Sequence, residues 1–533
     1  MFLWKCSKMQ SAPLQSTYQY RRKAMKRRSS AAAFTLIFTL LSILTAYSYA
    51  ADSDSGPPSS DGSLDSVNAR ADYFRLDNDY VPPPGEALHH YTAGYAKILC
   101  SAVFITGLDP DDAAANVGGF ISPFDQRQHV VDTRVDRERQ LIALTLPDGV
   151  TRIARRYGSQ GCVTRPMGQE TLLFTPSIIE PDLPPAESMP WPMGDVLSDD
   201  PWPAGVDKEL VERAIDVGFG PPEARTLGLV VTYQGRIIGE RYGDDVDMHT
   251  PLESWSMTKS LTGTLMGVLI QQGAYELWQE APIPEWQLAR DDPRQQIRIG
   301  DIMRMSSGIM INAPADPDFD PDTYPDHVYL YTGGENLHQY AATRPQEYPP
   351  NTIGRYRNTD PVLASYLIRL AVEGRGDDYH AFPQRALFDK LGIRNALIET
   401  DAYGNFLGQG LAFMPARDWA RLANLYLEDG VWNGERLLPE GYVEYACTVA
   451  PAWQSDGRPI YGGAFFWVTD SETEDGAPLK AFHMRGAGGQ STNIIPSHGL
   501  VYVRIGKYTG ARAGGEALNR MIPMLMEAVP QVQ

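Results

Sequence analysis

The feature that most constrains the fold is a pair of strand-rich segments at the two ends of residues 205–533. Residues 227–242 hold two apolar, alternating stretches joined by a Gln-Gly turn, which is the pattern of a β-hairpin. Residues 491–505 hold a second strand pair, and residues 515–529 have the pattern of a helix. Helical patterns lie between these ends. We therefore expect an α/β chain of the α+β type, whose two ends join in one antiparallel sheet flanked by helices.

Composition divides the rest of the chain into shorter regions. The chain has 533 residues, 43% of them hydrophobic, which suits one large domain or two ordinary ones. The polar residues 51–80 are predicted to be a disordered leader. Residues 81–175 are expected to form a small N-terminal α+β subdomain, and the proline-rich residues 176–204 an extended linker. Residues 205–533 then form the main domain.

The net charge limits the classes of partner. The chain has 47 Lys and Arg residues against 66 Asp and Glu residues, a formal charge of −19 at pH 7. An acidic surface repels phosphate, so we expect no nucleic-acid partner and no docking on an anionic membrane. The oligomeric state is left open.

The first fifty residues have the organisation of a secretory signal peptide. A basic cluster over 21–28 precedes an apolar run over 31–47, and Ser-Tyr-Ala at 48–50 places small residues where a signal peptidase reads. A transmembrane anchor is the alternative, but it needs about 20 apolar residues and this run is shorter. We predict a signal peptide over 1–50, with Met25 as an alternative start, and a secreted or periplasmic protein without stable membrane insertion.

Three cysteines follow that segment. In an oxidising compartment we expect a disulfide between Cys100 and Cys162, with two separate buried thiols as the alternative. Cys447 is left over and is expected to be a small buried residue. The spacing of the cysteines and histidines matches no zinc pattern, so the sequence predicts neither a metal nor a cofactor.

The chemistry concentrates after the first hairpin, in a Ser-x-x-Lys pair. Ser256 and Lys259 lie three residues apart in the first turn of an expected helix, so the amine can reach the hydroxyl. A serine becomes a nucleophile when a base takes its proton, and a desolvated lysine can be that base. The alternative is a helix-terminal serine beside an exposed lysine. Only six lysines follow residue 50, so fewer than about 0.5 chance matches are expected.

Two further motifs follow in order. Tyr356 and Asn358 form a Tyr-x-Asn element before a helix, and residues 485–491 are a glycine-rich stretch that opens a terminal strand. With this order, the sequence resembles the penicillin-recognising serine hydrolases of the class C β-lactamase superfamily, and most closely the aminohexanoate-dimer (nylon-oligomer) hydrolases and related esterases. The resemblance covers about residues 205–533 and not 81–175. It implies a β-lactamase/transpeptidase-like fold with a helical subdomain.

The resemblance also implies roles for the matched residues. Ser256 would be the acylated nucleophile and Lys259 its general base or proton shuttle. Tyr356 would relay a proton to the leaving group, and Asn358 would position the substrate or the lysine by hydrogen bonds.

The third motif departs from the family pattern. Where relatives have Lys-Thr-Gly or His-Thr-Gly, this chain has Met484-Arg485-Gly486, with His483 one step out of register. Gly486 and the N–H of Ala487 are still expected to provide an oxyanion donor, because a backbone donor needs no particular side chain. A cation that binds a β-lactam carboxylate is less secure, because Arg485 can point away from the site. This disfavours lactamase activity more than hydrolase activity.

Two classes of function follow. The first is an exported serine hydrolase that cleaves an amide or ester bond of a small molecule through a Ser256 acyl-enzyme. The alternative is a catalytically weak or inactive cell-envelope binding protein on the same fold. The acidic residues 316–326 resemble a calcium loop but lack its central glycine and terminal glutamate, so we expect a solvated loop at the rim of the site.

Overall fold

The structure is a computed structural model that describes residues 56–169, 171–472 and 478–532. The predicted signal peptide lies outside these residues. Within them, no helix is both long enough and apolar enough to span a bilayer.

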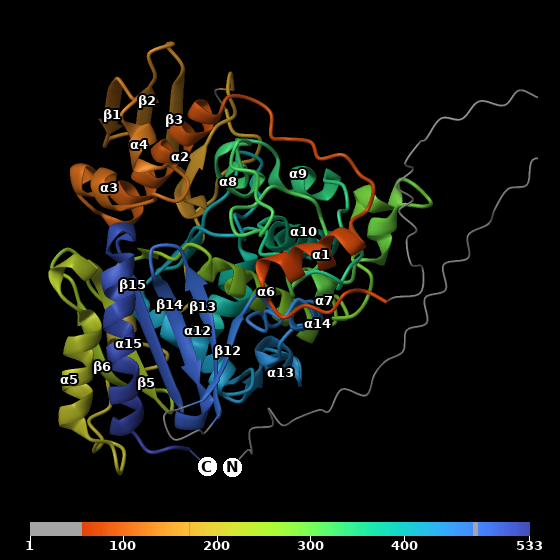
Figure 1. Cartoon of the computed structure of the whole chain (residues 1–533). Coiled ribbons are helices and arrows are strands. Elements are labelled where there is room, and N and C mark those ends of the chain that lie inside the picture. The colour runs from red at the N-terminus through yellow and green to blue at the C-terminus, as the bar shows by residue number, and fades with distance from the viewer. Residues whose placement is uncertain (1–55, 170, 473–477, 533) are drawn as a thin grey trace, which may run out of the picture.

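A six-stranded antiparallel sheet forms the centre of the molecule (Figure 1), in the order β12-β13-β14-β15-β5-β6. Its strands are β5 (Thr226–Tyr233), β6 (Arg236–Tyr242), β12 (Trp467–Glu472), β13 (Pro478–Gly486), β14 (Gln490–Ile495) and β15 (Leu500–Gly506). The last strand, β15, pairs with the first, β5, with Val503 opposite Val230. The prediction that the two ends of this region join in one sheet is therefore confirmed.

Helices cover both faces of this sheet. On one face, α5 (Lys208–Phe219) and α15 (Ala511–Ala528) lie side by side (Figure 1) and bury Val211 and Met521 against Leu229. On the other face lie α6 (Met257–Gln271) and α12 (Ala416–Leu427). The apolar residues of α6 are buried almost throughout its length. This central helix therefore has no solvent-facing stripe.

The chain between α6 and α12 forms a mainly helical region. Its helices are α7 (Ile299–Ile302), α8 (Asp326–Thr332), α9 (Leu337–Thr343), α10 (Thr359–Gly374) and α11 (Asp389–Leu391), and α13 (Tyr442–Cys447) and α14 (Pro451–Ser455) follow α12. A small sheet, β7-β9-β8, joins β7 (Leu252–Glu253), β9 (Ala412–Met414) and β8 (Leu397–Ile398), and β10 (Val431–Trp432) pairs with β11 (Glu435–Arg436). The longest helix of this region, α10, packs against α6.

The N-terminal elements, orange at the top of Figure 1, form a separate layer. They are α2 (Ala87–Ser101), α3 (Pro110–Asn116) and α4 (Phe124–Arg127), with a sheet of β1 (Asp132–Asp136), β2 (Leu141–Thr145), β3 (Thr151–Arg156) and β4 (Cys162–Thr164). Cys100 and Cys162 form a disulfide, with a Cα–Cα distance of 6.0 Å, that joins α2 to β4. The predicted pairing is present. Cys447, expected to be buried, is instead partly exposed at the end of α13.

The expectation of a disordered leader is wrong for part of residues 51–80. Leu64–Phe74 form a helix, α1, whose Ala71 packs in a buried cluster with Tyr348 and Ile353. Arg70 forms an ion pair with the fully buried Asp456, at 3.2 Å. Composition misses this helix because its stability comes from a distant surface of the main domain and not from its own few apolar residues.

The proline-rich residues 176–204 contain one short 3₁₀ turn, Ala186–Ser188, and otherwise follow the surface of the main domain. The indole N–H of Trp191 donates to the carbonyl of Gly235 at 2.7 Å. Arg421 donates to the carbonyl of Pro192 at 2.6 Å. Hydrogen bonds from the Trp191 side chain and to the Pro192 carbonyl thus hold this segment to the main domain.

Candidate active site

The site is built where the chain leaves β7 and enters α6. Trp255 has a φ of +48°, a left-handed conformation that is strained for a bulky residue, and Ser256 follows it at the N-cap position. The Ser256 side chain makes no capping hydrogen bond, so its hydroxyl is available to other groups. A Cβ on Gly486 would come within 2.2 Å of the Ser254 carbonyl oxygen, so only glycine allows β13 to approach this turn so closely.

Lys259 is the nearest polar partner of the serine. Its Nζ lies 2.9 Å from Ser256 Oγ and also donates to the carbonyl oxygen of Gln409 at 2.6 Å. The lysine is 1% exposed. This burial lowers the pKa of the Lys259 amine well below the usual lysine value, because the charged form loses its hydration. The one-turn spacing thus places a readily neutralised amine beside the hydroxyl.

Tyr356 lies on the other side of the amine, in the loop that leads into α10. The centroid of its ring is 5.0 Å from Lys259 Nζ, and the ring packs against Trp467 at 5.1 Å between centroids. Burial raises the pKa of the Tyr356 phenol above its usual value, and a hydrogen bond with Ser256 opposes that shift. The phenol therefore keeps its proton at neutral pH.

Asn358 lies at the N-terminal end of α10 and is completely buried. Its amide donates to the backbone carbonyl of His327 at 2.6 Å. The resemblance implied a hydrogen bond from this asparagine to substrate or to the lysine, and the hydrogen bond that its amide donates here goes to a residue of α8. The carbonyl that Lys259 contacts belongs to Gln409, which also accepts from the Tyr331 hydroxyl at 3.1 Å.

Sequence reasoning missed Gln409, His327 and Tyr331. The signal for Gln409 was its place between two glycines. A Cβ at Gly410 would come within 2.5 Å of the Tyr331 hydroxyl oxygen, so this turn passes close to the site. His327 and Tyr331 belong to none of the motifs, because the position of α8 in the fold is what brings them to the site.

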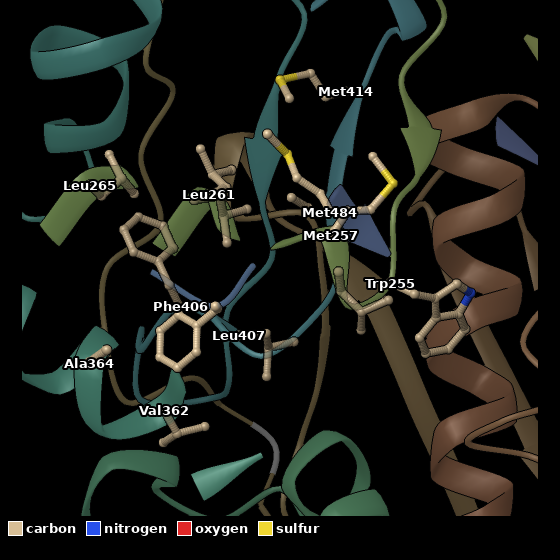
Figure 2. Packing of buried hydrophobic residues seen from close by; sticks show 14 of the residues in the cluster. Trp255, Met257, Leu261, Leu265, Val362, Ala364, Phe406, Leu407, Met414 and Met484 are labelled. Carbon is tan, nitrogen blue, oxygen red and sulfur yellow. The ribbon is translucent and has the colours of Figure 1, made fainter. Parts of the chain in front are cut away.

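The third motif lies along β13, where successive side chains point to opposite faces. Met484 faces α6 and is fully buried in one cluster with Met257, as Figure 2 shows. His483 and Arg485 point to the opposite face, with Arg485 Nη2 3.3 Å from His483 Nε2. Burial and the nearby guanidinium lower the pKa of His483 to about 3. Arg485 therefore does not supply a cation beside Ser256, and Ala487 follows in the turn after β13.

The acidic residues 316–326 are only in part the solvated loop that composition suggests, because Asp318, Asp320 and Asp322 are exposed but the acidic residues at the two ends are not. Asp316 is buried and pairs with Arg357 at 2.8 Å. Asp326 is also buried and accepts hydrogen bonds from Tyr80 and Tyr340. These two carboxylates anchor the ends of the loop to residues outside it. Among the described residues, no group of three or more His, Cys, Asp or Glu side chains could hold a metal ion.

Comparison with known proteins agrees with this geometry. The family model described as Beta-lactamase matches residues 214–517, more than half of the chain. The chain belongs to the beta-lactamase family. No curated protein matches it significantly. The match includes all three motifs of this beta-lactamase family member and leaves α1–β4 outside.

Several solved structures resemble this beta-lactamase family member. A candidate 6-aminohexanoate-dimer hydrolase from Bacillus anthracis is 20% identical, covers 66% of this chain and 91% of its own, and has a TM-score of 0.48. A penicillin-binding protein homologue from Caulobacter crescentus is 15% identical, covering 61% and 97%, with a TM-score of 0.44. A family VIII carboxylesterase is 15% identical, covering 59% and 97%, with a TM-score of 0.43.

Proposed function

We propose that this member of the family is an exported serine hydrolase that cleaves an amide or ester bond of a small molecule through a Ser256 acyl-enzyme. The observation that carries the proposal is the 2.9 Å separation of Lys259 Nζ and Ser256 Oγ. Because Lys259 is almost completely buried, its neutral form is available as a base.

Acylation begins when neutral Lys259 takes the proton of the Ser256 hydroxyl. The serine oxygen attacks the substrate carbonyl carbon, and the carbonyl electron pair moves onto its oxygen. The backbone N–H groups of Ser256 and Ala487 stabilise this oxyanion, and the N-terminal end of α6 adds a favourable field. No side chain is needed for these donors, so the altered third motif preserves them.

The leaving group departs with a proton relayed by Tyr356. Its phenol, which burial keeps protonated, donates a proton to the leaving amine or alkoxide as the carbon–heteroatom bond breaks. The protonated Lys259 then returns a proton to the phenol. Water hydrolyses the ester of Ser256 by the reverse order of proton transfers, which regenerates the hydroxyl and the neutral amine.

The expected substrates are linear esters and amides more than β-lactams. The position where relatives have a cationic residue is occupied by Met484, which is fully buried. Arg485 contacts His483 on the other face of β13. A substrate carboxylate at Ser256 would therefore not be paired by the side chain of Met484 or Arg485.

Two features of the chain support export, which is part of this proposal. The basic, apolar and small-residue order of residues 1–50 favours a cleaved signal peptide. A disulfide between Cys100 and Cys162 suits an oxidising compartment. We propose a secreted or periplasmic location.

Labelling with a fluorescent alkylphosphonate tests the nucleophile. The wild type should become labelled and should hydrolyse p-nitrophenyl acetate, whereas Ser256→Ala should do neither and should keep its thermal stability. Ser260→Ala is the matched control, because it also removes a buried serine hydroxyl from α6. That hydroxyl donates to the Phe465 carbonyl. Labelling of Ser256→Ala, or no labelling of the wild type, would refute the proposal and favour an inactive binding protein.

A further inference from the structure

Phe120 brings the N-terminal elements outside the family match into contact with aromatic rings next to the candidate active site. Phe120 lies between α3 and α4, and its ring is 5.8 Å from the rings of both Trp255 and His327 and 6.2 Å from that of Tyr331. All three contacts are edge-to-face, with interplanar angles of 81°, 89° and 86°. Such pairs stabilise a defined ring orientation.

Each ring that Phe120 contacts belongs to a residue that directly neighbours or contacts Ser256, Tyr356 or the hydrogen-bond acceptor of Lys259. Trp255 directly precedes Ser256 in the chain. The ring of His327 is 6.0 Å from that of Tyr356. The hydroxyl of Tyr331 donates to the same Gln409 carbonyl oxygen that accepts from the catalytic lysine.

The loop that carries Phe120 is held from both sides. Arg127 donates to the carbonyl of Val117 at 2.7 Å and to that of Ser122 at 3.1 Å. Gly118 has a φ of +65°, and a Cβ there would come within 1.9 Å of Ile98 Cδ1. These contacts fix the backbone on either side of Phe120, so its ring is presented in a preorganised position.

The whole N-terminal layer is anchored to the main domain near the same place. Lys97 and Glu399 form a buried ion pair at 2.9 Å, and the backbone N–H of Cys162 donates to Glu399 at 2.7 Å. Thr106 donates to the Pro251 carbonyl at 2.9 Å, just before β7. The position of Phe120 relative to the nucleophile is therefore set by a polar and covalent framework.

Phe120 itself remains partly exposed, although Trp255, Tyr331 and His327 are at most 5% exposed. An apolar ring that is held by its neighbours, is partly exposed and contacts the residue before the nucleophile is suited to contact an apolar part of a substrate. Tyr356 is the proposed proton donor to the leaving group. Within the described residues, its ring makes no ring contact with Phe120, whereas His327 contacts both rings. Its direct contact with Trp255, the residue before Ser256, favours a role for Phe120 beside the acyl part of the substrate.

We propose that Phe120 is a specificity-determining residue that limits the length of the acyl chain, so that the enzyme takes esters and amides of short acyl groups. This inference rests on the proposed hydrolase function. Truncating the ring should open space beside the nucleophile, and a longer acyl chain should then bury more apolar surface in the transition state. Under this proposal, the N-terminal layer is part of the substrate site.

The test compares p-nitrophenyl acetate with p-nitrophenyl hexanoate, which share a leaving group. In Phe120→Ala, the kcat/KM ratio of hexanoate to acetate should rise about tenfold, the range in which an apolar pocket discriminates methylene groups. Phe120→Leu should give an intermediate ratio. Phe174→Ala is the matched control, since Phe174 is another partly buried phenylalanine, 5.4 Å from the ring of His380, and it should leave the ratio unchanged.

The possible failures are distinguishable. An unchanged ratio in Phe120→Ala, with the acetate still hydrolysed, overturns this inference and leaves the proposed function standing. An equal fall for both esters, with a lower melting temperature, also overturns it, because Phe120 would then act only as a structural support. If the wild type neither hydrolyses an ester nor reacts with a phosphonate, the proposed function itself fails.

Discussion

Replacing Lys97 by methionine should destabilise the full, oxidised chain by about 3–5 kcal/mol, which is the usual effect of removing one partner from a buried ion pair. Lys97 and Glu399 are 2.9 Å apart, with side chains 1% and 0% exposed. Without the ammonium, the Glu399 carboxylate would lose its charge partner in a place that water does not reach. A loss of that size is a large share of the roughly 5–15 kcal/mol that stabilises a typical folded protein.

The structure contains a matched control for this experiment. Lys390 and Glu435 form an ion pair of the same residue types at the same 2.9 Å, but their side chains are 44% and 55% exposed. Lys390→Met should therefore change the stability by less than about 1 kcal/mol. The two substitutions remove the same chemical group and differ mainly in burial.

A double variant separates the charge from the packing. Glu399 also accepts from Ser101 Oγ and from the backbone N–H of Cys162, both at 2.7 Å. Glu399→Gln keeps an acceptor for these donors and removes the charge. Combined with Lys97→Met, it should restore more than half of the lost stability, because no unpaired charge remains buried.

Urea denaturation followed by tryptophan fluorescence gives the free energies of unfolding. The reasoning is refuted if Lys97→Met and Lys390→Met lose the same stability within about 1 kcal/mol, since burial would then have no effect on the pair. It is also refuted if the double variant is no more stable than Lys97→Met alone.

Three further outcomes are expected. Since burial lowers the pKa of Lys259, kcat/KM should stay high at neutral pH and fall only as acid protonates the amine, and a profile that still rises up to pH ~10 would contradict this. The mature chain should begin at Ala51, and non-reducing peptide mapping should link Cys100 to Cys162, whereas two freely alkylated thiols would contradict the link. With Met484 in place of a cation, kcat/KM for p-nitrophenyl acetate should exceed that for a chromogenic cephalosporin, and the reverse order would mean that another residue binds the carboxylate.

Patterns of short period predicted the local elements well. The alternation on either side of the Gln-Gly turn became β5 and β6, and the C-terminal pattern became β14, β15 and α15. The Ser256–Lys259 spacing predicted that both side chains lie on one face of a helix, because residues three apart are neighbours on any α-helix. These features depend on nearby residues only, so the sequence contains them directly.

The alternation of side chains along the third motif was predictable, but the elements that each face of the strand contacts were not. Alternation along β13 implies that Met484 and Arg485 point to opposite faces. Which face meets α6 depends on the register of β13 with β14, where Met484 lies opposite Thr492. The assignment of Arg485 to the far face therefore needed the folded sheet.

The parts that sequence alone could not decide are contacts between segments far apart in the chain. Disorder was the expectation for α1, yet Ala71 is buried against Tyr348. Phe120 carried no motif, and its importance comes from the three aromatic rings around it. Local patterns predicted elements such as β5, β6 and α15, whereas α1 depends on its tertiary contacts. The tertiary structure decides which surfaces they share, because that choice depends on burial and charge pairing that no short segment contains.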